Sequence, residues 1–130
     1  MNYGHLLDAS ALLALIFNEP GAGQVRDVID DSQVHAVNLG EVVRKLVALG
    51  MPVDEVIARI EDLKLEIVEE LNSRHIQEIA RLTVEAKRLG LSLGDCVCLV
   101  VAEFMGMAAV TADRRWSEVQ GRNVNILQIR

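Results

Sequence analysis

Residues 93–113 read LGDCVCLVVAEFMGMAAVTAD, and this stretch decides the fold class of the chain. Its first part, residues 93–105, is apolar nearly all round, which predicts a central helix that is buried on every side. Gly106 separates this helix from AAVT at 108–111, a short apolar run that predicts a buried strand. A buried helix followed at once by a buried strand is typical of an α/β sheet with helices on both faces.

The same alternation of short apolar runs and amphipathic segments extends through the chain. We expect strands at 5–7, 34–37, 64–70, 108–111 and 124–129. We expect helices at 10–17, 21–31, 39–50, 53–63, 73–89 and 93–105. There is no repeat, no low-complexity tract and no linker, so we predict one α/β domain over residues 1–130, with a mostly parallel five-stranded sheet flanked by helices on both faces.

The composition limits the classes of partner. Aromatic residues make up 3% of the chain, too few for a base-stacking platform. The net charge of −6 argues against a general nucleic-acid coat, because phosphate binding is driven by Lys and Arg. The same charge permits an acidic pocket that binds a cation, with local arginines for an anionic substrate.

The cysteines and the N-terminus point to a reducing compartment. Cys96 and Cys98 lie about 200° apart around a helix, so we expect two reduced thiols in apolar packing. The start, MNYGHLLD, has neither the basic region nor the long apolar run of a signal peptide. The longest apolar segment contains Glu103 and is too short for a membrane span. We therefore expect a soluble, cytoplasmic protein.

Four acids recur where elements of the expected sheet meet. Asp8 and Asp113 follow strands, and Glu41 lies in the first turn after the strand at 34–37. Because parallel strands end at one edge of a sheet, we expect these three side chains to share that edge. Asp95 begins the most apolar helix, where an unpaired carboxylate would be costly.

Each acid taken alone also has an interpretation as a helix cap. Asp8 and Asp113 are in place to cap the turns that follow them. Glu41 after Asn38 and Asp95 after Ser92 are in place to complete capping boxes. Capping and cation binding are compatible. Several oxygen ligands with no His or Cys among them suit Mg²⁺ or Mn²⁺ rather than zinc.

Three motifs in this order resemble the PIN-domain ribonucleases, specifically the VapC-type toxins of type II toxin–antitoxin pairs. They are LLDASALLALIFNEPGA at 6–22, VNLGEVVRKL at 37–46 and LSLGDCVCLVVAEFMGMAAVTADRRW at 91–116. The resemblance covers essentially the whole chain. It maps the acidic quartet of the family onto Asp8, Glu41, Asp95 and Asp113, and two hydroxyl positions of the family onto Ser10 and Thr111.

The resemblance implies a Mg²⁺- or Mn²⁺-dependent endoribonuclease that leaves 5′-phosphate and 3′-hydroxyl ends. Asp8, Asp95 and Asp113 are then the expected metal ligands, with Glu41 acting through a water or as a base. Ser10 and Thr111 are expected just behind them, and Arg114 and Arg115 are candidates for a substrate phosphate, although a solvated surface pair is an equal alternative. The resemblance further implies a VapB-type antitoxin as partner, a homodimer, and tRNA or rRNA as substrate, with no membrane partner.

Two other function classes stay open at this point. One is another Mg²⁺-dependent phosphoryl-transfer enzyme, although the chain lacks the Asp-x-Asp start of the haloacid dehalogenases, the paired acids of receiver domains and a Gly-rich phosphate loop. The other is a non-catalytic α/β binding domain whose acids are only caps. We expect no catalytic role for His5, His35 or His75, which have no metal-ligand spacing, and we expect Trp116 to pack rather than stack on bases.

Overall fold

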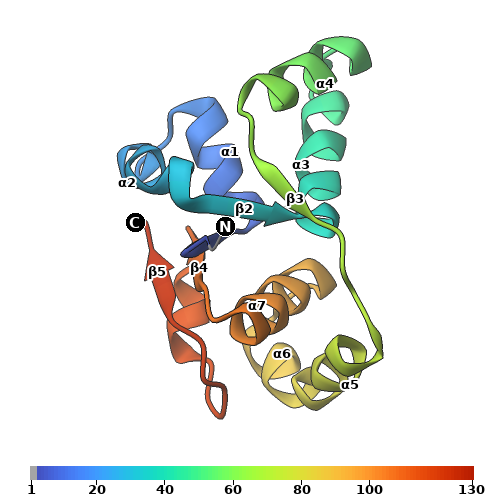
Figure 1. Cartoon of the computed structure of the whole chain (residues 1–130), viewed down its shortest axis with the longest axis vertical. Helices are drawn as coiled ribbons and strands as arrows, with labels where there is room; N and C mark the ends of the chain where they lie inside the picture. Colours follow the sequence, from blue (N-terminus) through green and yellow to red (C-terminus); the bar gives the residue numbers. More distant parts are fainter. Residues whose placement is uncertain (1–2) are drawn as a thin grey trace.

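A computed structural model describes residues 3–130 and contains one five-stranded sheet (Figure 1). The strands are β1 (His5–Leu7), β2 (Ser32–His35), β3 (Glu66–Val68), β4 (Ala108–Thr111) and β5 (Ile126–Gln128). Their order is β3-β2-β1-β4-β5 and every neighbouring pair is parallel, which confirms the predicted fold class. Residues 1 and 2, with which the expected domain and the signal-peptide prediction begin, lie outside the described residues.

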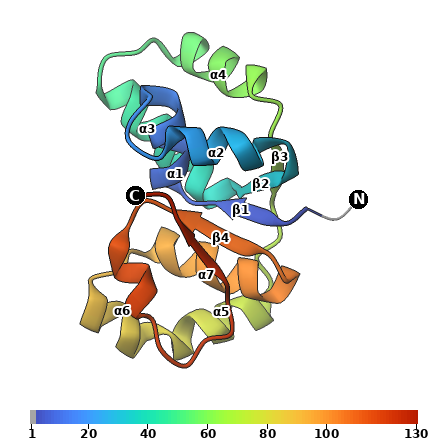
Figure 2. The same ribbon diagram turned by 90° about the vertical axis from the view of Figure 1, so that its left-hand side faces the viewer.

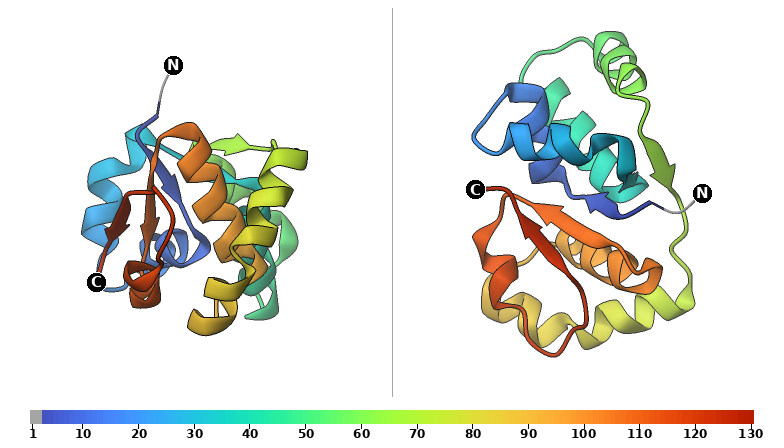
Figure 3. Two further views of the ribbon diagram at one scale, coloured as in Figure 1. Left: turned by 90° about the horizontal axis from the view of Figure 1, so that it is seen from below. Right: turned by 60° about the vertical axis from the view of Figure 1, so that its left-hand side comes forward.

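Helices cover both faces of the sheet (Figure 1). One layer holds α1 (Ala9–Phe17), α2 (Ala22–Val28), α3 (Ala36–Ala48) and α4 (Val53–Asp62), and the other holds α5 (Ser73–Arg81), α6 (Thr83–Leu89) and α7 (Leu93–Met105). Two 3₁₀ turns, η1 (Ile29–Asp31) and η2 (Arg114–Glu118), complete the described chain. The right-hand view of Figure 3 places the two helix layers on opposite sides of the strands.

The alternation of strand side chains divides the core in two. Leu6 and Ala109 face α7, whereas Leu7 and Val110 face α1 and α3. Helix α7 is the central helix of its layer, as predicted, with eight buried residues from Gly94 to Ala102. Figure 2 shows α7 against β4, with α5 and α6 farther from the sheet. The helix therefore carries its N-terminus, and with it Asp95, to the edge of the sheet where β1 and β4 end.

The predicted boundary between the second strand and its helix is wrong by two residues. Strand β2 ends at His35 and α3 begins at Ala36, whereas we expected a strand over 34–37. The reason is the cap: Nδ1 of His35 accepts a hydrogen bond of 3.1 Å from the backbone N–H of Val37. Asn38 therefore does not open the helix but lies inside it, 1% exposed.

Two predicted helices are also shorter than expected. The segment 73–89 divides at Leu82, whose backbone N–H donates to the carbonyls of Glu78 and Ile79 at 3.0 and 3.1 Å. This tightened turn buries the Leu82 side chain under the sheet, a tertiary contact that helical periodicity does not reveal. The segment 21–31 ends as an α-helix at Val28 and continues as η1.

Strands β3 and β5 are shorter than the expected 64–70 and 124–129, whereas the predictions for the two cysteines and Trp116 are confirmed. Gly50, which follows α3, has φ +101°, a left-handed conformation that a glycine adopts readily after a helix. Cys96 and Cys98 are buried free thiols, and Trp116 is fully buried. Within residues 3–130 no helix combines the length and the apolar character needed to cross a bilayer.

Candidate functional site

Asp8 is the most deeply buried acid at the carboxyl edge of the sheet. It follows β1 and caps α1, with Oδ1 accepting a hydrogen bond of 2.7 Å from the backbone N–H of Ala11. Its side chain is also the acceptor for the hydroxyls of Ser10 at 2.7 Å and Thr111 at 2.6 Å. Burial raises the pKa of Asp8 to about 6, against the lowering effect of these hydrogen bonds. The carboxyl group is thus oriented rigidly but ionised at a cost.

The two hydroxyls also connect Asp8 with the turn that carries Asp113. The Ser10 hydroxyl oxygen accepts a hydrogen bond of 2.9 Å from the backbone N–H of Ala112. The Thr111 hydroxyl oxygen accepts one of 3.0 Å from the backbone N–H of Asp113. Ser10 and Thr111 therefore hold the Asp8 carboxylate and the backbone of the turn that carries Asp113, and their role beside a metal stays a prediction.

Asp95 lies at the start of α7 in the predicted capping box with Ser92. The backbone N–H of Ser92 donates to Oδ2 of Asp95 at 2.8 Å, and the backbone N–H of Asp95 donates to the Ser92 hydroxyl at 3.1 Å. One carboxylate oxygen is thereby used by the backbone. The cap interpretation of this acid is correct, and the second oxygen carries no hydrogen bond from the described residues.

Glu41 does not lie in a capping box, in contrast to the prediction. It is the sixth residue of α3, a turn farther along than expected, because the helix begins at Ala36. Asn38 instead uses its side-chain N–H to donate to the carbonyl of Gly94 at 3.1 Å. The buried Oδ1 of Asn38 has no hydrogen-bond partner among residues 3–130. Asn38 therefore ties α3 to the first turn of α7, one helical turn before Glu41.

Gly94 makes room for the Glu41 carboxylate beside Asp95. A Cβ atom at position 94 would lie 1.8 Å from Oε1 of Glu41, far inside contact distance. Burial and then the charge of Asp95 raise the pKa of Glu41. This role of Gly94 was not predicted, although a glycine in the first turn of a strongly apolar helix is a signal of close packing.

Asp8, Glu41 and Asp95 share one region of the molecule. The charge of Asp95 contributes to the raised pKa of Asp8, after burial, as it does for Glu41. The fully buried thiol of Cys98 also has a strongly raised pKa, first from burial and then from the charges of all three acids. The charge of Asp95 therefore opposes the ionisation of both Asp8 and Glu41.

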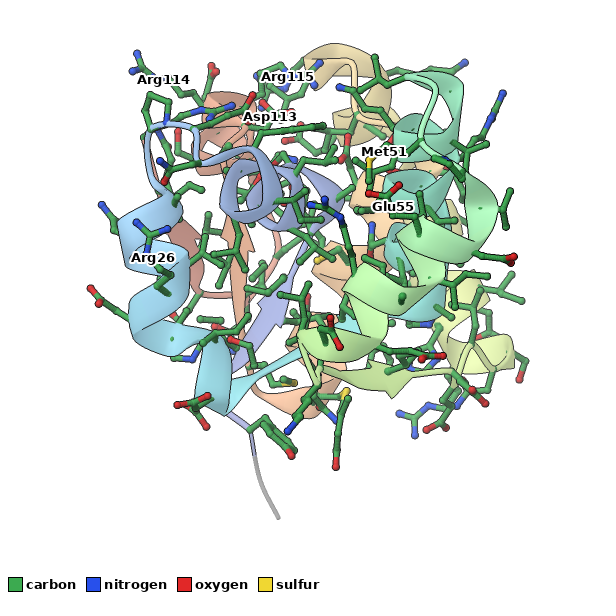
Figure 4. The ribbon with its side chains drawn as sticks, turned by 90° about the horizontal axis from the view of Figure 1, so that it is seen from above. Arg26, Met51, Glu55, Asp113, Arg114 and Arg115 are labelled. Atoms are coloured by element: carbon green, nitrogen blue, oxygen red, sulfur yellow. The ribbon has the colours of Figure 1, made fainter. Side chains whose placement is uncertain are left out.

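Asp113 has a different environment from the other three acids. It caps η2 through the backbone N–H of Arg115 at 3.0 Å and pairs with the Arg115 side chain, whose Nε lies 2.9 Å from Oδ1. Hydrogen bonds from Arg115 lower the pKa of Asp113. Figure 4 shows Asp113 beside Arg115, with Arg114 projecting away from them. Within residues 3–130, the Arg114 side chain makes one long hydrogen bond, from Nε to the carbonyl of Arg130 at 3.4 Å.

The donor set fits a hard divalent cation, although the side chains as they stand do not form a closed metal site. Within the described part of the chain, no three His, Cys, Asp or Glu side chains converge closely enough to hold a metal ion. The acids at the edge nevertheless offer oxygen atoms only, which suits Mg²⁺ or Mn²⁺. Gly94 has no Cβ atom, and the Glu41 carboxylate occupies the space that this leaves. A cation would relieve the repulsion that the charge of Asp95 exerts on Asp8 and Glu41.

The histidines have structural partners. His35 caps α3 and its Nε2 lies 2.9 Å from the carbonyl of Glu70. His75 completes a capping box with Asn72 at the start of α5. His5 lies at the opposite end of β1 from Asp8 and contacts Asp31. These contacts give each ring a role in the fold.

Comparison with known proteins gives one family and several solved structures. The family model described as PIN domain matches residues 5–122. A crystal structure of PAE2754 from Pyrobaculum aerophilum is 25% identical with a TM-score of 0.59, over 95% of this chain and 91% of that one. No curated protein matches the sequence.

Two further solved structures are more distant in sequence but share the fold. DNA-bound VapBC from Salmonella typhimurium is 15% identical with a TM-score of 0.72, over 98% of this chain and 99% of that one. VapBC-5 from Mycobacterium tuberculosis is 19% identical with a TM-score of 0.63, over 97% and 98% of the two chains.

Proposed function

This chain belongs to the PIN domain family, and we propose that it is a Mg²⁺- or Mn²⁺-dependent endoribonuclease that acts as the toxin of a toxin–antitoxin pair. The observation that supports the proposal is that Asp8, Glu41 and Asp95 lie at the same part of the carboxyl edge of a parallel sheet, where the charge of Asp95 adds to the effect of burial in raising the pKa values of Asp8 and Glu41. Helix capping alone does not require acids from three different helices to lie near one another. A scaffold domain would gain stability by separating these charges.

The proposed metal ligands are Asp8, Asp95 and Asp113, with Glu41 acting through a water or as a base. A bound divalent cation would supply an activated water and neutralise charge on the phosphate. Asp8 would be oriented for this task by Ser10 and Thr111, whose hydroxyls donate hydrogen bonds to its carboxylate. Glu41 suits proton transfer, because its raised pKa makes it a better base than an ordinary glutamate.

The proposed substrate is RNA, and a tRNA or an rRNA loop is the expected target. The net charge of −6 means that phosphate binding must be local rather than spread over the surface. Arg114 is the candidate contact, because it follows Asp113 and its guanidinium group is nearly free of intramolecular bonds. Recognition would then depend on the shape of the RNA around the acidic edge.

The proposed partner is a VapB-type antitoxin, with the toxin as a homodimer in the cytoplasm. This part of the proposal rests on the fold shared with the VapBC structures and on the resemblance of the motifs. A basic segment of the antitoxin could neutralise the acidic edge. Copurification from the native host without any small partner would count against it.

The test is cleavage of total cellular RNA by the purified full chain with Mg²⁺, with Mn²⁺ and with chelator. Asp8→Asn and Asp95→Asn are the site variants, since Asn keeps the capping oxygen of each residue. Asp27→Asn, on the exposed side of α2, is the matched control. Discrete metal-dependent cuts from wild type and the control, but not from the site variants, are expected. Equal cleavage by all four proteins would reject the proposed site.

A further inference from the structure

Arg115 is bound by two separate elements. Its Nε donates to both carboxylate oxygens of Asp113, at 2.9 and 3.1 Å, and Nη2 donates to Oδ2 as well. Its Nη1 donates to the carbonyls of Leu89 and Gly90, at 3.0 and 2.8 Å. A guanidinium group has five N–H donors, and these contacts use four of them: one on Nε, one on Nη2 and two on Nη1.

The carbonyls that Arg115 binds belong to the end of α6. Gly90 is the left-handed cap of that helix, with φ +71°, and a Cβ atom there would lie 2.9 Å from Nη1 of Arg115. The guanidinium group therefore lies directly against the helix end, where the free carbonyls and the helix dipole favour a positive charge. Leu91 and Ser92 follow, and then the turn that carries Asp95.

Arg115 thus connects the turn of Asp113 with the segment that leads into Asp95. The described contacts give no other cation a bond to either acid. The Arg115 side chain is 48% exposed to solvent, although most of its N–H donors are used in intramolecular hydrogen bonds.

We propose that Arg115 is a positioning residue that fixes the Asp113 carboxylate against the segment carrying Asp95, and that it is not a ligand of the substrate phosphate. The planar fork of Arg can bind a carboxylate on one side and two carbonyls on another, which the single ammonium of Lys cannot do. Of the two adjacent arginines, only Arg114 then remains for substrate. This inference rests on the proposed function, because it takes Asp113 as a metal ligand.

The first experiment measures Mn²⁺ binding to the full chain by calorimetry, without RNA. Arg115→Ala and Arg115→Lys should both weaken the binding by about tenfold, as loss of an outer partner of a metal ligand does. Arg114→Ala, the matched neighbour, should bind Mn²⁺ like wild type. Guanidinium chloride at a few millimolar should restore part of the affinity of Arg115→Ala, which a general loss of stability would not allow. Wild-type affinity in both Arg115 variants would overturn the proposal.

The second experiment separates positioning from phosphate binding. Binding of a short single-stranded RNA is measured against salt concentration in chelator, where no metal contributes. Loss of one phosphate contact should reduce the salt slope by about 0.7. We expect that reduction in Arg114→Ala and an unchanged slope in Arg115→Ala. The reverse pattern would overturn the proposal.

These outcomes also distinguish a wrong role for Arg115 from a wrong function for the whole chain. If wild type binds Mn²⁺ and cleaves RNA and both Arg115 variants do the same, only the positioning role of Arg115 is wrong. If wild type neither binds Mn²⁺ nor cleaves RNA, the proposed function fails and the inference fails with it. Circular dichroism and thermal melting establish that each variant is folded. Arg115→Lys keeps the positive charge and is the variant to measure if Arg115→Ala does not fold.

Discussion

The acids at the edge of the sheet fall into two groups with opposite electrostatics. Asp8, Glu41 and Asp95 lie together with no cationic side chain bonded to any of them in the described chain, and the pKa values of Asp8 and Glu41 are raised. Asp113 is only a short turn from β4 but is paired with Arg115, and its pKa is lowered. The environment of Asp8 and Glu41 disfavours their charged forms, whereas that of Asp113 favours its charged form. The first group therefore has no cationic partner within the described chain, whereas Asp113 has one in Arg115.

The largest effect should come from Glu41 in the uncompensated group. Glu41→Gln keeps the shape and removes the base, so the rate of RNA cleavage at saturating Mn²⁺ should fall by roughly 10²–10⁴-fold. The melting temperature should change little, since Glu41 is exposed on one side and makes no hydrogen bond to the described chain. Glu55→Gln, on α4 (Figure 4), is the control and should cleave like wild type. A Glu41→Gln protein with full activity would remove Glu41 from the site.

Replacement of Asp8 should show how much a buried carboxylate without a cationic partner destabilises the metal-free protein. Its folded pKa of about 6 is above the ordinary value of an unfolded Asp, so the stability linked to its protonated form is complete below about pH 4 and is lost as pH rises through about 6. The metal-free protein should therefore become more stable between pH 7 and pH 5. Asp8→Asn should gain about 2 kcal/mol at pH 7 and lose this pH dependence, because two pKa units correspond to about 3 kcal/mol and the Asn side chain gives up part of the hydrogen bonding.

Urea titrations at several pH values measure this effect. A destabilised Asp8→Asn protein at pH 7 would mean that its hydrogen bonds to Ser10 and Thr111 outweigh the buried charge. Mn²⁺ should raise the melting temperature of wild type more than that of the variant, since only wild type has a charge to relieve.

Gly94 tests whether the position of Glu41 matters as well as its charge. In Gly94→Ala the new Cβ would displace the Glu41 carboxylate, which is the flexible end of its side chain, so the fold should tolerate the change. Alanine is also the better helix former, by about 1 kcal/mol. We expect unchanged or higher stability with cleavage reduced about tenfold, the effect of a misplaced outer group. Gly40→Ala in α3, where nothing lies within 4 Å of the new Cβ, is the control and should gain stability without loss of activity.

The parts of this site that the sequence predicted are those set by local chemistry. Asp8 and Asp95 are caps whose partners lie within three residues, and the strand before Asp113 is a plain apolar run. The fold class followed in the same way from the apolar helix at 93–105. What could not be predicted depends on packing between distant segments, as in the contacts of Asn38 and Glu41 with Gly94 across more than fifty residues. The start of α3 was misplaced because a histidine, which is an uncommon cap, ends β2.

The smallest change in stability should come from Asp113, whose charge is paired with Arg115, and it should be opposite in sign to that of Asp8→Asn. The pKa of Asp113 is lowered in the folded state, so its contribution to stability is present above the ordinary pKa of Asp and is lost as pH falls through the lower folded value. Asp113→Asn should therefore lose stability at pH 7, but by no more than about 1 kcal/mol, because the Arg115 side chain is half exposed and the pair is screened by solvent. The urea midpoints of Asp113→Asn and Asp8→Asn, measured at pH 7 without metal, should move in opposite directions. If both midpoints rise, Arg115 does not compensate Asp113, and all four acids form a single repulsive cluster.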